Sequence, residues 1–382
     1  MIHVALCGPM SLKLLQERLD GAPILPRGYE FPFMAYLACA LLGEGLKVTV
    51  ITSCSDVGSI SEWRGKDLHV IATPRRCRNL YFVDAYRKEV AHMRRAIRAV
   101  HPDIVHANWT YEFADAAISS GFPHLVTAHD SPWTALKAIR NVYTFYRTCY
   151  ASCHVIPKIK NISFVSDYIQ SECAKYHRLP HFQYVIPNGI QTTLCVDKPH
   201  AKVKNVLEPK FVCVSGGGRL KNVPVLLEAF RLVKQKHPRA RLVVVGLSEC
   251  GRIVKGVDMV GRLPHDQVLR HLDEADIYVN TTLNESFCMS VLEAMARGLP
   301  CIAGSSSGAV PWLFDGGKAG LLVDVASSAS VAQGMVRLID DATLYQQLGR
   351  SGLERAKHSF LLNRVAGHYH VVYQEILSRG LS

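Results

Sequence analysis

Two glutamates eight residues apart, Glu285 and Glu293, form the pattern in this chain with the most chemical content. The residues from Ser290 to Arg297 have helical composition, and Gly298 followed by Pro300 predicts the end of that helix. Glu285 is therefore expected in a loop and Glu293 one turn inside the helix. Unpaired N–H groups at a helix start bind phosphate. Two carboxylates around such a point suit a ligand that is anionic in the middle and hydroxylated at both ends, such as a nucleotide sugar.

Two apolar segments flank this pattern and support it. Ile277 to Asn280 has the composition of a buried strand that leads into the loop, and Cys301 to Gly304 has that of the strand after the helix. A strand, loop, helix and strand in this order form a crossover unit, which binds ligands at the carboxyl ends of its strands. The alternative is a pair of solvated charges, which the flanking strands disfavour.

A second loop combines small residues with positive charge. Gly216, Gly217 and Gly218 follow a predicted strand and allow close approach of the backbone to a ligand. Arg219 and Lys221 then bring two cations to the same place. These charges are expected to bind phosphate, and the alternative is that they are ordinary surface residues.

The helix that follows this loop is expected to begin near the two cations. Asn222 is a good N-cap residue, and Pro224 falls in the first turn. Fixed cations and helix N–H groups can stabilise the charge on a departing diphosphate without a metal ion. The chain has no two aspartates separated by one residue, so neither a metal nor another cofactor is expected.

Several segments together resemble the group-1 family of retaining glycosyltransferases, which have the two-domain GT-B fold. The resemblance implies a metal-independent retaining enzyme that moves a sugar from a nucleotide-diphosphate donor to a surface glycan or lipid-linked acceptor, as in polysaccharide or lipopolysaccharide biosynthesis. It covers most of the chain. The segments are PDIVHAN (102–108), VTAHD (126–130), VIPNGI (185–190), GGGRLKNVPVLLEAF (216–230) and NESFCMSVLEAMARGLPCIAG (284–304).

The resemblance also implies roles for residues around the glutamate pair. Glu293 matches the family glutamate that accepts hydrogen bonds from ribose hydroxyls, and Glu285 matches the one near the donor sugar. The backbone N–H groups near Met289 and Ser290 are expected to meet the phosphates. Cys288 stands in this donor-binding loop where a glycine is common.

Other positions match the family less closely. Lys221 lies at the family distance from LLEAF, whereas the loop between Arg219 and Lys221 is several residues shorter than usual. His129 ends a predicted strand and matches a family histidine that touches the transferred sugar, although a lone histidine can also be structural. Gly28, expected in an acceptor or phosphate loop, is single where the family has two glycines, and Trp312 replaces a common glutamate.

The chain length and the order of elements predict two domains, because 382 residues are too many for one ordinary core. We expect an acceptor-binding Rossmann-like domain over residues 1–200 and a donor-binding one over 201–358, facing a cleft. The linker is expected at 197–209. By the resemblance, a helix in 359–382 packs back on the first domain. The predicted strands are 2–6, 47–51, 103–106, 125–128, 211–215, 241–245, 277–280, 301–304 and 320–323, and the predicted helices include 32–42, 84–100, 223–236 and 361–379.

The N-terminal region and the cysteines predict a cytoplasmic protein. The apolar stretch from Phe31 to Gly43 is too short to cross a bilayer, and Met1 to Leu12 lacks the basic start of a signal peptide. Twelve cysteines, mostly single in apolar segments, are expected to be reduced. Cys149 and Cys153 have no Cys or His cluster beside them, so no zinc site and no disulfide is expected.

The net charge of +12 raises the question of partners. Basic amphipathic segments are predicted over 84–100 and 133–150, and such segments can lie on an anionic membrane or simply form a solvated face. We expect peripheral contact with the inner face of a membrane. A nucleotide-sugar epimerase or a phosphorylase of the same fold is the nearest alternative. Nucleic-acid binding is disfavoured because the basic residues are dispersed and no reading motif is present.

Overall fold

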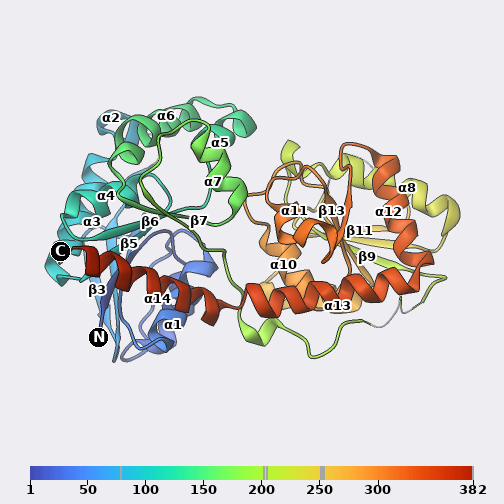
Figure 1. Ribbon diagram of the computed structural model, residues 1–382, viewed down its shortest axis with the longest axis horizontal. Coiled ribbons are helices and arrows are strands. Elements are labelled where there is room, and N and C mark those ends of the chain that lie inside the picture. The colour runs from blue at the N-terminus through green and yellow to red at the C-terminus, as the bar shows by residue number, and fades with distance from the viewer. Residues whose placement is uncertain (78–79, 201–202, 204, 250–253, 381–382) are drawn as a thin grey trace. The chain divides into compact units, whose positions relative to one another are not determined.

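The computed structural model describes residues 1–77, 80–200, 203, 205–249 and 254–380 (Figure 1). The chain forms two compact units, one of Met1–Gly189 with Leu362–Ser382 and one of Ile190–Leu361. The chain thus passes from the first unit to the second after Gly189, before the expected boundary at residue 200. It returns to the first unit at Leu362, after the expected boundary at residue 358. Residues 201, 202 and 204 of the expected linker, and 381–382 of the last segment, lie outside the described residues.

The first unit contains an eight-stranded sheet in the order β3-β4-β2-β1-β5-β6-β7-β8. Every neighbouring pair is parallel except β3 and β4. The inner strands β5 and β6 are buried throughout, as expected for parallel strands covered on both faces. The strands are β1 His3–Cys7, β2 Lys47–Cys54, β3 Ser61–Arg64, β4 Leu68–Pro74, β5 Ile104–Asn108, β6 His124–Ala128, β7 Asn161–Phe164 and β8 Phe182–Val185.

Helices cover this sheet and include the last helix of the chain (Figure 1). Helix α14 packs against α1 and contributes Val365, Tyr369 and Tyr373 to the core of the first unit. The hydroxyl of Tyr373 lies 2.6 Å from Nδ1 of the buried His106 on β5. The helices are α1 Pro32–Gly43, α2 Tyr81–Asp84, α3 Arg87–Val100, α4 Glu112–Ser120, α5 Pro132–Ile139, α6 Val142–Tyr150, α7 Asp167–Ala174 and α14 Leu362–Arg379.

The basic segment expected over 133–150 forms two helices. Arg140 adopts φ +50°, which ends α5, and the side chain of Asn141 caps α6 by accepting a hydrogen bond from the Thr144 N–H at 2.8 Å. We name α5, α6 and the two residues between them the α5–α6 hairpin. In the described part of the chain, no helix combines the length and the apolar character needed to cross a membrane.

The second unit contains a six-stranded parallel sheet in the order β11-β10-β9-β12-β13-β14. The prediction of two doubly wound α/β domains is thereby confirmed. The strands are β9 Lys210–Val214, β10 Arg241–Val245, β11 Val257–Gly261, β12 Ile277–Val279, β13 Cys301–Gly304 and β14 Leu321–Val323. The helices are α8 Val223–Lys236, α9 His265–Glu274, α10 Met289–Ala296, α11 Val310–Leu313, α12 Ser328–Asp340 and α13 Ala342–Ser359.

Candidate functional site

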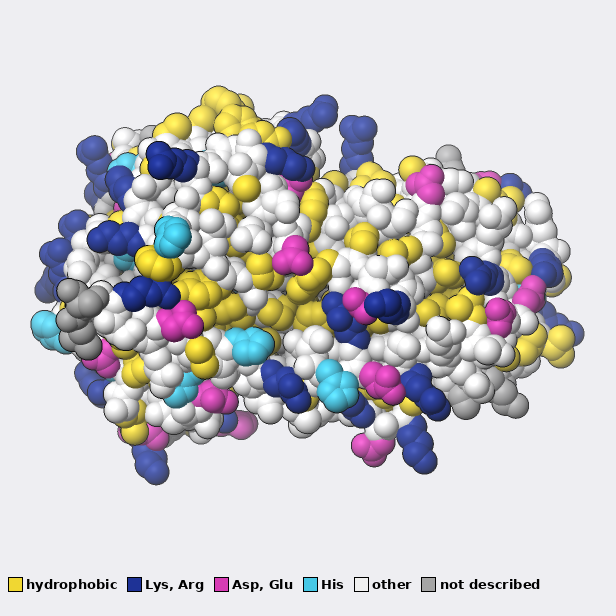
Figure 2. Space-filling view, in the orientation of Figure 1, with side chains coloured by type: hydrophobic (Ala, Val, Ile, Leu, Met, Phe, Trp, Pro, Cys, Tyr) yellow, Lys and Arg dark blue, Asp and Glu magenta, His cyan; other side chains and the backbone are white. Residues whose placement is uncertain are grey.

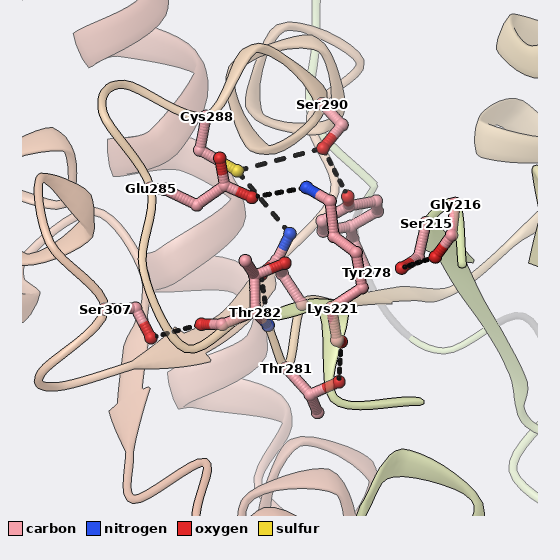
Figure 3. Close-up of polar contacts among 11 residues, drawn as sticks. Ser215, Gly216, Lys221, Tyr278, Thr281, Thr282, Glu285, Cys288, Ser290 and Ser307 are labelled. Atoms are coloured by element: carbon pink, nitrogen blue, oxygen red, sulfur yellow. Dashed lines mark hydrogen bonds and ion pairs between the residues drawn. The ribbon is translucent and has the colours of Figure 1, made fainter. Parts of the chain in front are cut away.

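Two loops of the second unit meet because the strands before them are neighbours. The loop after β9 runs through residues 215–222, and the loop after β12 runs through 280–288. The Leu283 N–H donates to the Leu220 carbonyl at 2.8 Å. Beside this link, Nζ of Lys221 donates to Oε1 of Glu285 at 2.8 Å (Figure 3). Two residues that are 64 apart in the sequence are thus joined at one edge of the sheet.

The contact with Glu285 stabilises the charged form of Lys221. Burial disfavours the ammonium, but the Glu285 carboxylate outweighs this effect and raises the pKa of Lys221 above its usual value. The side chain of Lys221 is 36% exposed and that of Glu285 is 16% exposed. The ammonium is therefore charged at neutral pH and can be reached by a ligand from solvent.

The glycine loop beside this pair is open. A side chain at Gly216 or Gly218 would meet no neighbouring atom within 4 Å, and only Gly218, with φ +114°, needs to be glycine for its own backbone. Arg219 is exposed next to it. Internal packing thus does not explain the glycines at 216 and 217, and the space above them is available to a ligand.

Asn222 does not cap α8 in the expected way. It has a left-handed backbone with φ +52°, and its side chain makes no capping hydrogen bond. Its Nδ2 instead donates to the Val325 carbonyl at 2.7 Å, after β14. Asn222 therefore ties the glycine loop to the segment that follows the edge strand β14. Pro224 stands in the first turn of α8 as predicted.

The start of α10 is shaped by Cys288. Its φ is +76°, a left-handed conformation that favours glycine, so this chain keeps the backbone of a glycine with a different side chain. The buried thiol accepts a hydrogen bond from Asn280 Nδ2 at 3.5 Å. Burial raises the pKa of the Cys288 thiol, which is therefore protonated and inert.

The first turn of α10 presents Met289 and Ser290. The Tyr278 hydroxyl donates to Oγ of Ser290 at 2.9 Å, which anchors the helix start to β12 (Figure 3). The unpaired N–H groups of this turn lie directly after the loop that carries Glu285. Positive charge from Lys221 on the glycine loop and partial positive charge from the start of α10 thus come from the two loops that meet here.

Glu293 has a different partner from Glu285. Its Oε1 accepts a hydrogen bond at 3.0 Å from Nε2 of His265, the first residue of α9. The hydrogen bond and charge of Glu293 raise the pKa of His265. A ligand hydroxyl that binds Glu293 must therefore share the carboxylate with His265 or replace it.

A segment that the sequence analysis did not single out holds the Glu285 loop in place. A Cβ at Gly308, whose φ is +62°, would lie 2.3 Å from the Glu285 carbonyl oxygen. That carbonyl accepts a hydrogen bond from the Ala309 N–H at 2.9 Å, and Ser307 Oγ donates to the Thr282 carbonyl at 2.6 Å. Gly308 is thus needed for close backbone approach.

In the first unit, His129 follows β6 and is buried. Its Nε2 donates to Asn108 Oδ1 at 2.7 Å, and its ring lies 5.4 Å from that of Phe31 in an edge arrangement. Burial lowers the pKa of His129 to about 3. The imidazole is therefore neutral at pH 7 and is suited to hydrogen bonding rather than to charge stabilisation.

A pocket of about 470 Å³ lies in the first unit after the ends of β2, β4, β5 and β6. The guanidinium carbon of Arg147 is 3.7 Å from the centre of the Tyr111 ring, and the Tyr111 hydroxyl is 3.5 Å from both oxygens of Asp130. Arg147 Nε and Glu112 Oε2 are buried without a hydrogen-bond partner among the described residues. Buried polar atoms of both signs thus belong to residues that line the pocket.

The sequence analysis missed most of this pocket. The quoted segments PDIVHAN and VTAHD reach Asn108 and Asp130, but neither was connected with Tyr111 or with a pocket. The signal was available, since residues that follow neighbouring parallel strands share one edge of the sheet. The contribution of Arg147 depends on how α6 folds back, which the spacing did not reveal.

Two further predicted positions have structural explanations. A Cβ at Gly28 would lie 2.5 Å from the Met10 carbonyl oxygen, so the glycine is required by the path of its own loop. Trp312 packs at 6.1 Å from Phe287 and 5.7 Å from Phe360, measured between ring centres. Over the residues that the structure describes, no group of three or more His, Cys, Asp or Glu side chains is placed to hold a metal ion.

By its fold and its two loops, the chain is an α/β protein with ligand-binding loops at the carboxyl ends of parallel strands. Comparison with family models narrows this class. Residues 197–355 match the model for glycosyl transferases group 1, and residues 33–194 match the model for Glycosyltransferase Family 4. The two matches together cover most of the chain, which belongs to the group-1 glycosyltransferases.

Individual relatives agree with this assignment. The chain is 27% identical over 177 residues to N-acetyl-alpha-D-glucosaminyl L-malate synthase of Bacillus anthracis, covering 44% of this chain and 46% of that protein. It is 27% identical over 217 residues to the GDP-mannose-dependent alpha-(1-6)-phosphatidylinositol monomannoside mannosyltransferase of Mycobacterium tuberculosis, covering 50% and 56%. The chain thus aligns with about half the length of these curated relatives.

A solved structure supports the fold over the whole chain. Sucrose-phosphate synthase from Thermosynechococcus elongatus superposes with a TM-score of 0.76 at 18% identity, covering 99% of this chain and all of that one. At this identity the likeness concerns the fold alone. The predicted GT-B fold class is confirmed.

Proposed function

We propose that this protein transfers a sugar from a nucleotide-diphosphate donor to a glycan or lipid-linked acceptor, with retention at the transferred carbon and without a metal ion. The observation that carries the proposal is the pair formed by Lys221 and Glu285, where the glycine loop meets the start of α10. This pair puts a reachable cation and a carboxylate beside a helix start. A diphosphate with an attached sugar needs both kinds of group.

The donor is proposed to bind the second unit. Its diphosphate lies over Gly217 and Gly218 and receives hydrogen bonds from Lys221 and from the N–H groups of Met289 and Ser290. Cys288 supplies the backbone turn that aims these groups. The M. tuberculosis relative is named as GDP-mannose-dependent, which supports a nucleotide sugar as donor.

The two glutamates are proposed to hold the ends of the donor. Glu285 lies next to the phosphate-binding cation and accepts hydrogen bonds from the sugar. Glu293 accepts them from the ribose, in exchange for its bond to His265. Arg219 is exposed at the rim of the glycine loop and adds attraction for the phosphates from solvent.

The chemistry follows from this placement. The bond between the sugar carbon and the phosphate oxygen breaks, and negative charge grows on the departing diphosphate. The acceptor oxygen forms the new bond to the sugar carbon on the same face, and its proton passes to the departing phosphate oxygen. Lys221 and the start of α10 stabilise that charge where it develops, which is the effect that accelerates the step. The proposed metal independence rests on this positive charge.

The acceptor is proposed to bind the first unit. The pocket beside Arg147 and Tyr111 offers hydrogen-bond donors, acceptors and aromatic rings, which together suit a hydroxylated head group. His129, neutral and hydrogen-bonded, is proposed to touch the transferred sugar, and Gly28 belongs to the neighbouring acceptor loop. The named acceptor of the M. tuberculosis relative, a phosphatidylinositol monomannoside, supports a lipid-linked acceptor.

A ligand screen followed by a transfer assay tests the proposal. Uridine, guanosine and adenosine diphosphates are first compared by thermal shift, and the matching labelled nucleotide sugars are then offered with membrane extract and with chelator present. We expect one nucleotide to stabilise the fold and its sugar to be transferred. Absence of any nucleotide effect, or transfer only when a divalent metal is restored, would contradict the donor site or its metal independence.

A further inference from the structure

The α5–α6 hairpin exposes apolar side chains at its tip. Val142 is 77% exposed, Ile139 56% and Phe145 55%, and Val83 in the nearby α2 is 79% exposed. Hydrophobic side chains gather over α6 at the edge of the first unit (Figure 2). Four large apolar side chains in water at one edge are unusual for a surface without a partner.

Positive charge surrounds these apolar side chains. Lys137 and Arg140 on the hairpin are exposed, and so are Arg87 and Lys88 at the start of α3. The chain has no acidic residue from 131 to 166, although that stretch contains five lysines and arginines. The surface of the hairpin is therefore cationic as well as apolar.

The acidic residues of α2 and of the first turn of α3 are engaged within the fold. Arg76 donates to Asp84 at 2.7 Å and to Glu89 at 2.6 Å, which uses both carboxylates. Glu89 is itself buried. The exposed cations are thus not matched by exposed carboxylates of α2 or of the first turn of α3.

Aromatic packing joins the two parts of the surface. The ring of Tyr86, between α2 and α3, lies 6.1 Å from the Tyr146 ring and 5.0 Å from the Tyr150 ring, both on α6. The start of α3 therefore lies against α6. We name Val83, Ile139, Val142 and Phe145, with Arg87, Lys88, Lys137 and Arg140, the docking surface.

Helix α3 differs from the hairpin in one decisive respect. Its apolar face, with Val90, Met93 and Ile97, is buried against the sheet, so only its charged face is available. The sequence allowed either helix to lie on a membrane. In the structure, α3 can therefore contribute only positive charge to a membrane contact, and the exposed apolar side chains come from the hairpin and from α2.

We propose that the docking surface binds the first unit to an anionic lipid bilayer. Apolar side chains surrounded by lysine and arginine are the combination that interfacial segments use, with the side chains in the head-group region and the cations on anionic lipid. Charge complementarity favours a bilayer over a second copy, because a copy of this surface is equally cationic.

The same hairpin connects the bilayer to the pocket of the first unit. Five hairpin residues also line the pocket, namely Ile139, Asn141, Tyr143, Thr144 and Arg147. Docking therefore brings the pocket to the level of the lipid head groups. The docking surface does not depend on the proposed transfer reaction; only the inference that the acceptor is drawn from the bilayer rests on it.

Vesicle sedimentation tests the docking surface with the full chain. We expect the protein to sediment with vesicles that contain phosphatidylglycerol and to remain in solution with vesicles of phosphatidylcholine alone. Replacing Arg140 by Gln is expected to weaken binding about fivefold. Replacing Val142 and Phe145 together by Ser is expected to weaken it at least about tenfold, because both side chains lose their burial in the head-group region.

Matched controls identify the surface. Val371→Ser, at a 53% exposed apolar position on α14, and Lys13→Gln, at an exposed charge in the same unit, are expected to bind as the wild type does. Thermal melting checks that each variant is folded. Equal binding of wild type and hairpin variants, no binding to either vesicle, or conversion of a dimer to a monomer in the hairpin variants would overturn the proposal.

A nucleotide titration separates this proposal from the proposed function. Thermal shift by nucleoside diphosphates in the absence of vesicles reports on the second unit only. Vesicle binding without any nucleotide effect would leave docking intact and remove the transfer reaction. A nucleotide effect without vesicle binding would leave the proposed donor site intact and overturn the docking surface.

Discussion

At the residue scale, the partnership between Lys221 and Glu285 matters most because it sets opposite charges around one ligand position. The carboxylate keeps the ammonium charged, yet it also competes with a phosphate for it. The two residues are therefore expected to affect nucleotide binding in opposite directions, although both are needed for transfer.

Substituting each member of the pair tests this relation. Lys221→Ala is expected to weaken nucleoside-diphosphate binding and to lower kcat by about 10²–10³-fold, because the departing charge loses its cation. Glu285→Gln is expected to tighten nucleoside-diphosphate binding about fivefold, since a nearby like charge is removed, while transfer is lost. Calorimetric titration and initial rates measure the two effects, with Lys318→Ala on the exposed surface as control. A change of nucleoside-diphosphate affinity in the same direction in both variants would contradict the placement of the diphosphate beside this pair.

Cys288 offers a test of backbone strain at the start of α10. Its φ of +76° costs on the order of 1 kcal/mol for a side chain and nothing for glycine. Cys288→Gly is therefore expected to change the free energy of unfolding by less than about 1 kcal/mol, because relief of strain offsets the lost burial. Cys288→Val is expected to destabilise by about 2–3 kcal/mol, since a β-branched residue tolerates this region poorly. Chemical unfolding measures the free energy of unfolding of both variants. An equal loss of stability in the two variants would contradict the predicted strain at Cys288.

At the element scale, the loop that carries Glu285 depends on the segment between β13 and α11. Ser307 and Ala309 hold the loop by hydrogen bonds, and Gly308 permits the contact. Sequence analysis found the helix and strands around this loop but not its support. The hydrogen bonds that hold the loop end on backbone carbonyl groups. Which carbonyl groups lie close together depends on the folded structure and cannot be inferred from the types of the residues that carry them.

Gly308→Ala is expected to displace the Glu285 loop and lower transfer by about 10²-fold while the protein remains folded. Gly316→Ala is the matched control, because Gly316 has a similar φ of +67° and no atom within 4 Å of an added Cβ. Both variants carry the backbone strain of about 1 kcal/mol, but only the first carries the clash. Equal kcat in the two variants would show that the close approach is unimportant for the site.

The same distinction explains which elements the sequence predicted. Helix α8 and strands β10 and β13 have the predicted bounds, since apolar period and flanking glycine or proline mark them clearly. Strand β3 has the sequence SEWR and half of it is exposed, and β8 lies exposed at the edge. Such strands are stabilised by pairing with a neighbour, which local sequence does not report.

At the scale of the whole molecule, each domain owes its core to parallel strands, and the chain's last helix completes the first core. The two parallel-sheet domains were predictable from alternating strands and helices together with length, whereas the return of the last helix was implied only by the family resemblance. The partners of individual side chains were not predictable. Lys221 and Glu285, or His106 and Tyr373, are distant in the sequence and meet only through the strand order.

Two buried histidines make the stability of the first unit depend on pH. Burial lowers the pKa of His106 to about 3 and that of His129 to about 3, whereas the unfolded chain binds these protons near pH 6.5. Their contribution is therefore fully present above about pH 6.5 and is lost as the pH falls toward 3. Each histidine is expected to remove about 1.4 kcal/mol of stability per pH unit in that window.

Thermal unfolding between pH 7 and pH 4.5 measures this dependence. His106 and His129 together make stability fall with decreasing pH, and His129→Asn is expected to remove about half of that joint contribution to the slope of stability against pH. His181→Asn, at an exposed histidine, is expected to leave the slope unchanged. An unchanged slope in His129→Asn would show that this imidazole is not buried and neutral in solution.

The central claim is that a diphosphate binds where the glycine loop meets the start of α10. The most direct measurement is a crystal structure of the protein soaked with the nucleotide sugar that the thermal-shift screen selects. We expect phosphate oxygens within hydrogen-bond distance of Lys221 Nζ and of the N–H groups near Met289 and Ser290, with the ribose at Glu293. A donor bound elsewhere in the second unit, with Lys221 still held only by Glu285, would contradict it.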